Sequence, residues 1–209
     1  MIGDLRYMEL LAAPGSALAI TRAILESQFD DPSHPLHPLR ALHRAAMDEL
    51  SKEPLAGKHV LDYRSGTAEF GVWMATENAE VHLLDPSPQA VELGLKRAQA
   101  SGAARRVKAI QLTDPANLDM FADDAFELIF TQAPLAELSE SPGAFQEIAR
   151  IMKPDARLVM AQAEAPVRAR LTALERLFTE VQIQDITAHK GLLARLLPSA
   201  GPVVITALK

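Results

Sequence analysis

His59-Val60-Leu61-Asp62-Tyr63-Arg64-Ser65-Gly66-Thr67-Ala68-Glu69-Phe70 is the stretch that decides the predicted fold of this chain. Its aliphatic run ends at the acid Asp62, a turn built around Gly66 follows, and a helical pattern with Phe70 and Met74 then begins. A short strand, a tight turn and a helix in this order form the first unit of α/β domains that bind nucleotides. The stretch therefore predicts a strand-loop-helix unit whose turn contacts a ligand.

A second acid stands at the end of the next predicted strand. Val81-His82-Leu83-Leu84 has the pattern of a buried strand and is followed directly by Asp85. Nucleotide-binding folds place a ribose-binding carboxylate about 20 residues beyond the turn, which is where Asp85 stands. Two strand-end acids beside one tight turn predict a pocket for a ligand that carries a ribose.

The rest of the chain after residue 55 alternates between strand and helix patterns. Strands are predicted near 58–62, 80–84, 107–111, 127–131 and 157–161, and helices near 69–77, 88–101, 142–152 and 167–178. Such alternation predicts a parallel sheet with helices on both faces. The β-forming runs 181–185 and 203–208 are expected to pair as an antiparallel hairpin, because no full-length crossover helix fits after residue 203. The predicted fold class is α/β, a Rossmann-like sheet that is mostly parallel with an antiparallel C-terminal edge strand.

The N-terminal quarter has a different pattern. Residues 1–54 carry a helical period and little strand character, and we expect them to form a helical extension or lid ahead of an α/β domain at 55–209. Ser16 is placed to cap one helix, and Pro38 is placed to open another.

Composition excludes several classes of partner. The 209-residue chain has a net charge of −6 and a pI near 5.5, which argues against nucleic acid as a partner because phosphate recognition needs a basic surface. No apolar run approaches the roughly 18–20 residues of a membrane span, and the N-terminus lacks the basic-then-apolar order of a signal peptide. We therefore expect a cytoplasmic protein without membrane contact. There is no cysteine, and His34, His37 and His43 lack the fixed spacing of a zinc site, so no metal is expected.

At this point the residues resemble a known family, the class I S-adenosylmethionine-dependent methyltransferases of the small-molecule type. The resemblance covers about residues 55–209. Five stretches resemble the family's motifs in order: Val60–Ala68 (the acid and glycine turn), Asp85–Gln89 (the ribose acid), Thr113–Leu118 (the acid facing the adenine), Ala125–Ile129 (the fourth strand) and Glu147–Pro154 (the helix and turn before the fifth strand). The resemblance implies S-adenosylmethionine as cofactor and a small-molecule methyl acceptor as partner. A homodimer or a heteromeric partner stays open.

The expected cofactor-binding residues follow from these stretches and from the carboxyl edge of the fourth strand. They are Asp62, Arg64, Gly66, Asp85, Pro86, Asp114 and Gln132. For several of them a purely structural role stays open as an alternative to cofactor binding. Asp62 can satisfy backbone amides of its own turn, Asp85 can be an ordinary turn acid, and Gln132 can simply be solvated. No pairing in the sequence identifies a catalytic base, and methyl transfer to a nucleophilic acceptor can run largely on proximity and orientation.

The chain departs from the family at the glycine turn. The three loop glycines of the family stand here as Arg64, Gly66 and Ala68. Glycine lets the backbone approach a ligand closely, so a long cationic side chain at this position must turn outward, pair with the cofactor's carboxylate, or fold inward and fill the site.

Three classes of function are compatible with the predicted fold and the resemblance. The first is an active methyltransferase, and the second is a degenerate methyltransferase fold that serves as a binding or scaffold subunit. The third, a nicotinamide-dependent oxidoreductase, is opposed by Asp62-Tyr63-Arg64, where glycine is expected, and by the antiparallel ending.

Overall fold

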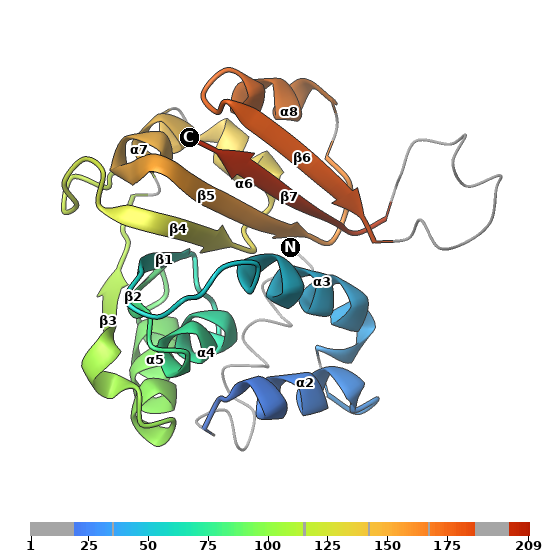
Figure 1. Ribbon diagram of the computed structural model, residues 1–209, viewed down its shortest axis with the longest axis vertical. Helices are drawn as coiled ribbons and strands as arrows, with labels where there is room; N and C mark the ends of the chain where they lie inside the picture. The colour runs from blue at the N-terminus through green and yellow to red at the C-terminus, as the bar shows by residue number, and fades with distance from the viewer. Residues whose placement is uncertain (1–18, 35, 115, 142, 167, 187–200) are drawn as a thin grey trace, which may run out of the picture. The chain divides into compact units, whose positions relative to one another are not determined.

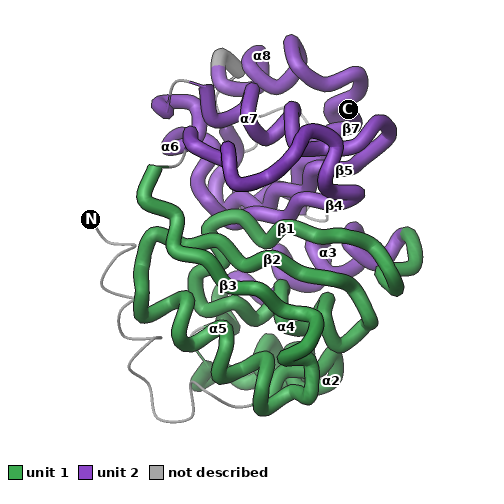
Figure 2. Tube along the Cα trace, turned by 90° about the vertical axis from the view of Figure 1, so that its left-hand side faces the viewer, with its two compact units in different colours: residues 1–38, 53–114 green, residues 39–52, 115–209 purple. Residues whose placement is uncertain are grey.

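The computed structural model describes residues 19–34, 36–114, 116–141, 143–166, 168–186 and 201–209. The chain forms two compact units, drawn in different colours in Figure 2. Unit 1 contains residues 1–38 and 53–114, and unit 2 contains residues 39–52 and 115–209. In the described part of the chain no helix is both long enough and apolar enough to cross a membrane.

Unit 1 is built on three parallel strands. They are β1 (His59–Tyr63), β2 (Glu80–Asp85) and β3 (Val107–Gln111), and they lie in the order β3-β2-β1. α4 (Glu69–Thr76) connects β1 to β2, and α5 (Pro88–Ala100) followed by the 3-10 turn η2 (Ala104–Arg106) connects β2 to β3. Ser87 caps α5, because its hydroxyl accepts a hydrogen bond from the amide of Ala90 at 3.3 Å. The predicted strands and helices of this region are confirmed to within about two residues.

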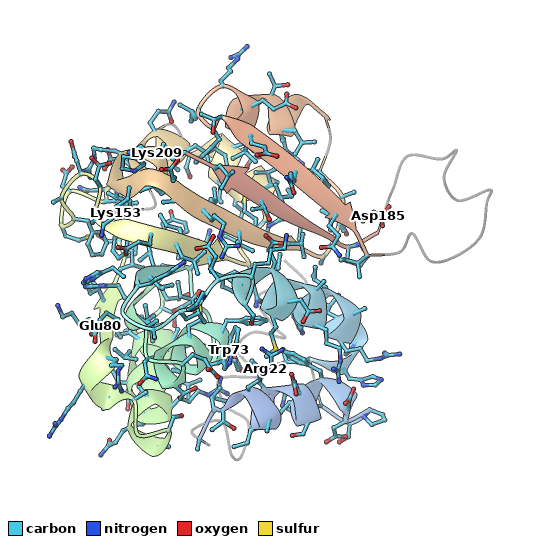
Figure 3. The ribbon with its side chains drawn as sticks, in the orientation of Figure 1. Arg22, Trp73, Glu80, Lys153, Asp185 and Lys209 are labelled. Carbon is cyan, nitrogen blue, oxygen red and sulfur yellow. The ribbon has the colours of Figure 1, made fainter. Side chains whose placement is uncertain are left out.

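The N-terminal helix of unit 1 packs on α4. α2 (Arg22–Asp30) begins after Thr21, whose hydroxyl accepts a hydrogen bond from the amide of Ile24, while the predicted cap Ser16 lies outside the described residues. The ring of Phe29 stacks on that of Phe70 with 6.3 Å between centroids. Figure 3 shows Arg22 beside Trp73, with the guanidinium carbon 5.9 Å from the centre of the Trp73 ring. These contacts bury one face of α2 against α4.

The described residues of unit 2 form four strands in the order β4-β5-β7-β6. β4 (Phe126–Thr131) and β5 (Met152–Gln162) are parallel, while β7 (Val203–Leu208) is antiparallel to both β5 and β6 (Glu180–Asp185). Figure 1 shows β7 between β5 and β6. The antiparallel pairing of the last two strands is confirmed. The C-terminal strand lies inside the sheet, because it pairs on both sides, and the edge position belongs to β6, most of whose side chains are exposed.

The described residues of unit 2 form four helices. They are α3 (Arg40–Leu50), which follows the short turn η1 (His37–Leu39), α6 (Leu135–Glu140), α7 (Ala144–Ile151) and α8 (Arg168–Glu175). α3 packs on β5 and β7, and a buried Arg157 on β5 donates a 3.0 Å hydrogen bond to the carbonyl of Glu49 on α3. The two N-terminal helices α2 and α3 therefore lie in different units. The division of the chain at residue 54 stays a prediction.

The mostly parallel Rossmann-like α/β fold is confirmed by these strands and helices. β5 begins at Met152, five residues before the predicted start, and α6 was missing from the predicted elements. Asp155, directly after Pro154, adopts a left-handed φ of 63° near the start of β5. This conformation favours glycine, so an aspartate holds it at the cost of some strain.

Candidate functional site

The loop between β1 and α4 keeps the backbone of a glycine-rich turn. φ is 57° at Arg64, 56° at Gly66 and 62° at Ala68, so the left-handed conformation recurs at every second residue. These are the positions that the resembled family fills with glycine. Because an alanine or arginine pays about 1 kcal/mol or more to stay in this region, the surrounding contacts must hold the turn in place.

Asp85 is one of those contacts. Its Oδ2 accepts a 2.9 Å hydrogen bond from the amide of Gly66, and its Oδ1 accepts one of the same length from the amide of Ser87. The amide of Ser65 also donates to the carbonyl of Leu84 at 2.8 Å. The structure thus brings Gly66 and Asp85 together and ties the loop to the end of β2.

Asp85 has the chemistry of a ribose-binding group but little exposed surface. A carboxylate offers about four lone-pair sites, and hydroxyl groups are among the donors that it accepts best. Only 4% of Asp85 is exposed, so little of its carboxylate faces solvent.

Asp62 faces the helix that follows the loop. Its Oδ2 accepts a 3.0 Å hydrogen bond from the amide of Gly71, and a Cβ placed on Gly71 would lie only 2.6 Å from that oxygen. Burial, opposed by the Gly71 hydrogen bond and supported by the nearby charges of Glu69 and Asp85, raises the pKa of Asp62 to about 8. The anchoring role of Asp62 on α4 is therefore clear, and its contact with a cofactor stays a prediction.

Arg64 and Asp114 both act on the buried phenol of Tyr63. Burial raises the pKa of Tyr63 to about 12, while the charge of Arg64 lowers it and that of Asp114 raises it. Arg64 is half-buried and Asp114 is exposed, which leaves part of each charged group within reach of solvent. Pro86 is exposed, and its carbonyl accepts a 3.1 Å hydrogen bond from the amide group of Gln111.

The side chain of Ala68 points away from the solvent-exposed side of the 64–68 loop. It is completely buried, and a Cβ placed on Gly94 of α5 would lie 3.2 Å from the Ala68 Cβ. The methyl group therefore faces α5. Of the two departures from glycine, only Arg64 carries a side chain that reaches partly exposed surface.

A buried ion pair behind the loop escaped the sequence analysis. Arg97 of α5 lies 2.5 Å from the Oε1 of Glu69, and both side chains are 7% exposed. Arg97 also donates to the carbonyl of Thr67, and the Thr67 hydroxyl donates to Glu69. The only available signal was that Arg97 falls on the stripe of α5 that also carries Ala90, Leu93 and Gly94.

The residues of the 64–68 loop and the end of β2 can be compared with what the nucleoside of the implied cofactor requires. The loop has the turn geometry, Asp85 presents a carboxylate beside the Gly66 amide, and the Ala68 methyl group is out of the way. The residues fit a ribose-bearing ligand, with Arg64 as the one unusual side chain at the rim.

Gln132 lies in unit 2, after the carboxyl end of β4, and is exposed. It lines a cavity of about 340 Å³. The other lining residues are Pro134, Leu135, Ala136, Gln162, Ala163, Glu164, Ala165, Pro166 and Arg170.

The three histidines that the sequence analysis weighed as metal ligands lie in separate environments. His34 accepts a hydrogen bond from the amide of Leu36 at 3.2 Å, the Nδ1 of His37 lies 2.9 Å from the carbonyl of Phe29, and His43 is buried on α3. Among the residues with described positions, no three histidine or acidic side chains come together as metal ligands do.

Comparison with known proteins agrees with this geometry. The family model described as "Methyltransferase domain" matches residues 54–196, more than half of the chain. A malonyl-[acyl-carrier protein] O-methyltransferase of Halorhodospira halophila is 29% identical over 154 residues, which are 71% of this chain and 50% of that protein. A ubiquinone biosynthesis O-methyltransferase of Xylella fastidiosa is 26% identical over 157 residues, 73% of this chain and 61% of that one. The chain thus spans about half to three fifths of the length of these relatives.

Solved structures show the same fold at low identity. A SAM-dependent methyltransferase from Aquifex aeolicus superposes with a TM-score of 0.59 at 17% identity, covering 88% of this chain and 96% of that one. The [4+2]-cyclase SpnF superposes with a TM-score of 0.63 at 20% identity, covering 86% and 85%. The family match, the turn at 64–68 and the Gly66–Asp85 contact lead to one conclusion. This chain belongs to the methyltransferase domain family, as a class I member for which S-adenosylmethionine is the implied cofactor.

Proposed function

We propose that this protein binds S-adenosylmethionine in unit 1 and transfers its methyl group to a small-molecule acceptor. The observation that carries the proposal is the left-handed turn at Arg64, Gly66 and Ala68, held by the carboxylate of Asp85. Substitution of two glycines has left the backbone of the turn in the shape that close approach to a nucleoside needs.

Each residue of this site has a role in the proposal. Asp85 accepts hydrogen bonds from the ribose hydroxyls, and the planar guanidinium of Arg64 pairs with the carboxylate of the amino-acid part. Asp62 fixes α4, and thereby the end of the loop, through Gly71. When bound, the cofactor supplies an activated methyl group on a sulfonium. The protein's contribution is alignment of the acceptor for in-line attack, which needs no strong base when the acceptor is already nucleophilic.

The family assignment does not identify the methyl acceptor, so the acceptor is part of the proposal. The names of three relatives specify a malonyl-[acyl-carrier protein], a demethylmenaquinone and ubiquinone biosynthesis, so related domains are named for different acceptors or pathways. We propose a small molecule, a cytoplasmic location and neither nucleic acid nor membrane as partner, on the charge and sequence arguments given above. A homodimer or a heteromeric complex remains compatible with them.

A binding or scaffold protein without transferase activity is the second candidate. Two observations favour it: arginine stands at the first glycine position, and Asp85 is only 4% exposed. One protein with this fold is called a [4+2]-cyclase, so the fold by itself does not select methyl transfer.

Calorimetric and thermal titration with S-adenosylhomocysteine separates these candidates. A ligand at about a hundred times its Kd stabilises the folded protein by roughly 2.7 kcal/mol, which raises Tm by about 5–10 °C for a chain of this length. We expect such a shift for the wild type and a smaller one for Arg64→Gly, which loses the guanidinium contact. Ala68→Gly is the matched control, because it also relaxes a left-handed residue but changes a side chain that faces α5. A shift that appears only in Arg64→Gly would support the scaffold instead, and its absence in all three proteins would overturn nucleoside binding.

A further inference from the structure

We propose that the cavity in unit 2 binds a small carboxylic acid that also carries a hydroxyl group. The cavity lies beyond the carboxyl ends of β4 and β5, between the segment at 132–136, the segment at 163–166 and Arg170 of α8.

The floor of the cavity is preorganised by a buried glutamine. Gln162 ends β5 and is 5% exposed; its Oε1 accepts a 2.7 Å hydrogen bond from the amide of Leu135 and its Nε2 donates to the carbonyl of Ala133 at 2.9 Å. The hydroxyl of Thr131 accepts from the amide of Ala133 at 3.0 Å. These bonds fix the backbone between β4 and α6, so the site requires little ordering when a ligand enters.

Three polar side chains of the lining have no hydrogen-bond or ion-pair partner within the part of the chain that the structure describes. They are the amide of Gln132, the carboxylate of Glu164 and the guanidinium of Arg170. Arg170 is half-buried, and a half-buried guanidinium is usually engaged. Arg150, which is similarly placed, is held by two carboxylates and two backbone carbonyls. The unused donors of Arg170 suit a ligand carboxylate, which a guanidinium binds through two parallel hydrogen bonds.

Glu164 restricts the charge of the ligand. The Glu164 carboxylate repels a ligand with two negative charges, such as a phosphate monoester, more strongly than a ligand with one carboxylate. The same Glu164 carboxylate can accept a hydrogen bond from a hydroxyl group of the ligand. Gln132 adds both a donor and an acceptor. The remaining walls are apolar, formed by prolines, alanines and Leu135, and the volume of about 340 Å³ is near the lower end for small-molecule sites. A single-ring hydroxy acid satisfies all of these features.

Calorimetric titration of the full chain with matched probes tests the assignment. 4-Hydroxybenzoate carries both groups, phenol lacks the carboxylate, and 4-hydroxyphenyl phosphate replaces it by a dianion. We expect the acid to bind at least about tenfold more tightly than phenol, since a charge-assisted pair contributes that much or more. Arg170→Gln should remove this difference and leave phenol binding unchanged. Arg176→Gln, an exposed arginine shortly after α8 and outside the lining, is the control and should bind like the wild type.

Glu164→Gln tests the charge argument, because it should improve binding of the phosphate probe by about tenfold or more over the wild type. Equal affinity of the wild type for acid and phenol, or an Arg170→Gln variant that keeps the preference, would overturn the site. A phosphate probe that already binds the wild type more tightly than the acid would overturn the carboxylate assignment. S-adenosylhomocysteine is titrated in parallel: acid binding without nucleoside binding rejects the proposed function but keeps the site in unit 2, and nucleoside binding without acid binding rejects only that site.

Discussion

Removal of the buried cation behind the loop should destabilise unit 1 far more than removal of an exposed one. The change is Arg97→Met, which keeps most of the side-chain length but removes the guanidinium. In the wild type this group contacts Glu69 at 2.5 Å and the carbonyl of Thr67. The Glu69 side chain is 7% exposed in the wild type. After the change it loses its cationic partner and keeps the hydrogen bond that the Thr67 hydroxyl donates.

The expected magnitude follows from this burial. Leaving one charge of a buried pair without its partner costs about 3–5 kcal/mol, a large part of the roughly 5–15 kcal/mol by which domains are stable. For a chain of this length each kcal/mol lowers Tm by roughly 2–4 °C, so we expect a decrease of about 6–20 °C. Lys96→Met on the same helix is the control: the Lys96–Glu92 pair is 57% and 65% exposed, and its loss should cost at most about 1 kcal/mol.

Urea unfolding of the wild type, of the single variants Arg97→Met, Glu69→Gln and Lys96→Met, and of the double variant Glu69→Gln/Arg97→Met measures these differences. The double variant removes both charges of the pair. Its loss in free energy of unfolding should therefore be smaller, by about 1–3 kcal/mol, than the sum of the losses of Glu69→Gln and Arg97→Met. Equal losses for Arg97→Met and Lys96→Met, or strictly additive effects in the double variant, would show that this buried pair does not hold the loop.

Three further predictions concern the site and its surroundings. The folded-state pKa of Asp62, about 8, lies above its ordinary value of 3.8, so the folded protein keeps a proton that the unfolded chain releases, and the free energy of unfolding should fall as pH rises from about 4 to 8. Asp62→Asn should therefore be close to the wild type at pH 4 and more stable than the wild type at pH 8.5 in urea titrations; an unchanged difference between the two pH values would refute the buried, protonated acid. Asp85→Ala should weaken S-adenosylhomocysteine binding roughly 10- to 100-fold in calorimetry, and equal affinities would remove Asp85 from the site. A chain starting at Leu55 should melt at lower temperature, because it loses the buried face of α3, and should lose methyl transfer while retaining nucleoside binding; full turnover would show that residues 1–54 do not form a lid over the acceptor.

The sequence was sufficient for the order and type of most elements. Strand patterns that end at Asp62 and Asp85, and the helix that opens after Ser87, depend on residues a few positions apart, so local periodicity and capping identify them. The antiparallel ending could also be predicted, because chain length leaves no room for a crossover helix. α6 was missed because it is one short turn-rich segment with too few residues for a period to appear.

What each site residue contacts was decided only by the tertiary structure. The sequence determined that Asp62, Arg64, Gly66 and Asp85 stand at strand ends and in the first turn, but not that Asp62 faces α4 while Asp85 holds the Gly66 amide. It gave no sign that Arg97 and Thr67, 30 positions apart, meet behind the loop, or that Gln162 organises the segment after β4. The physical reason is that periodicity reports which face of an element is buried, whereas the partner on that face comes from another element and depends on register and packing between them.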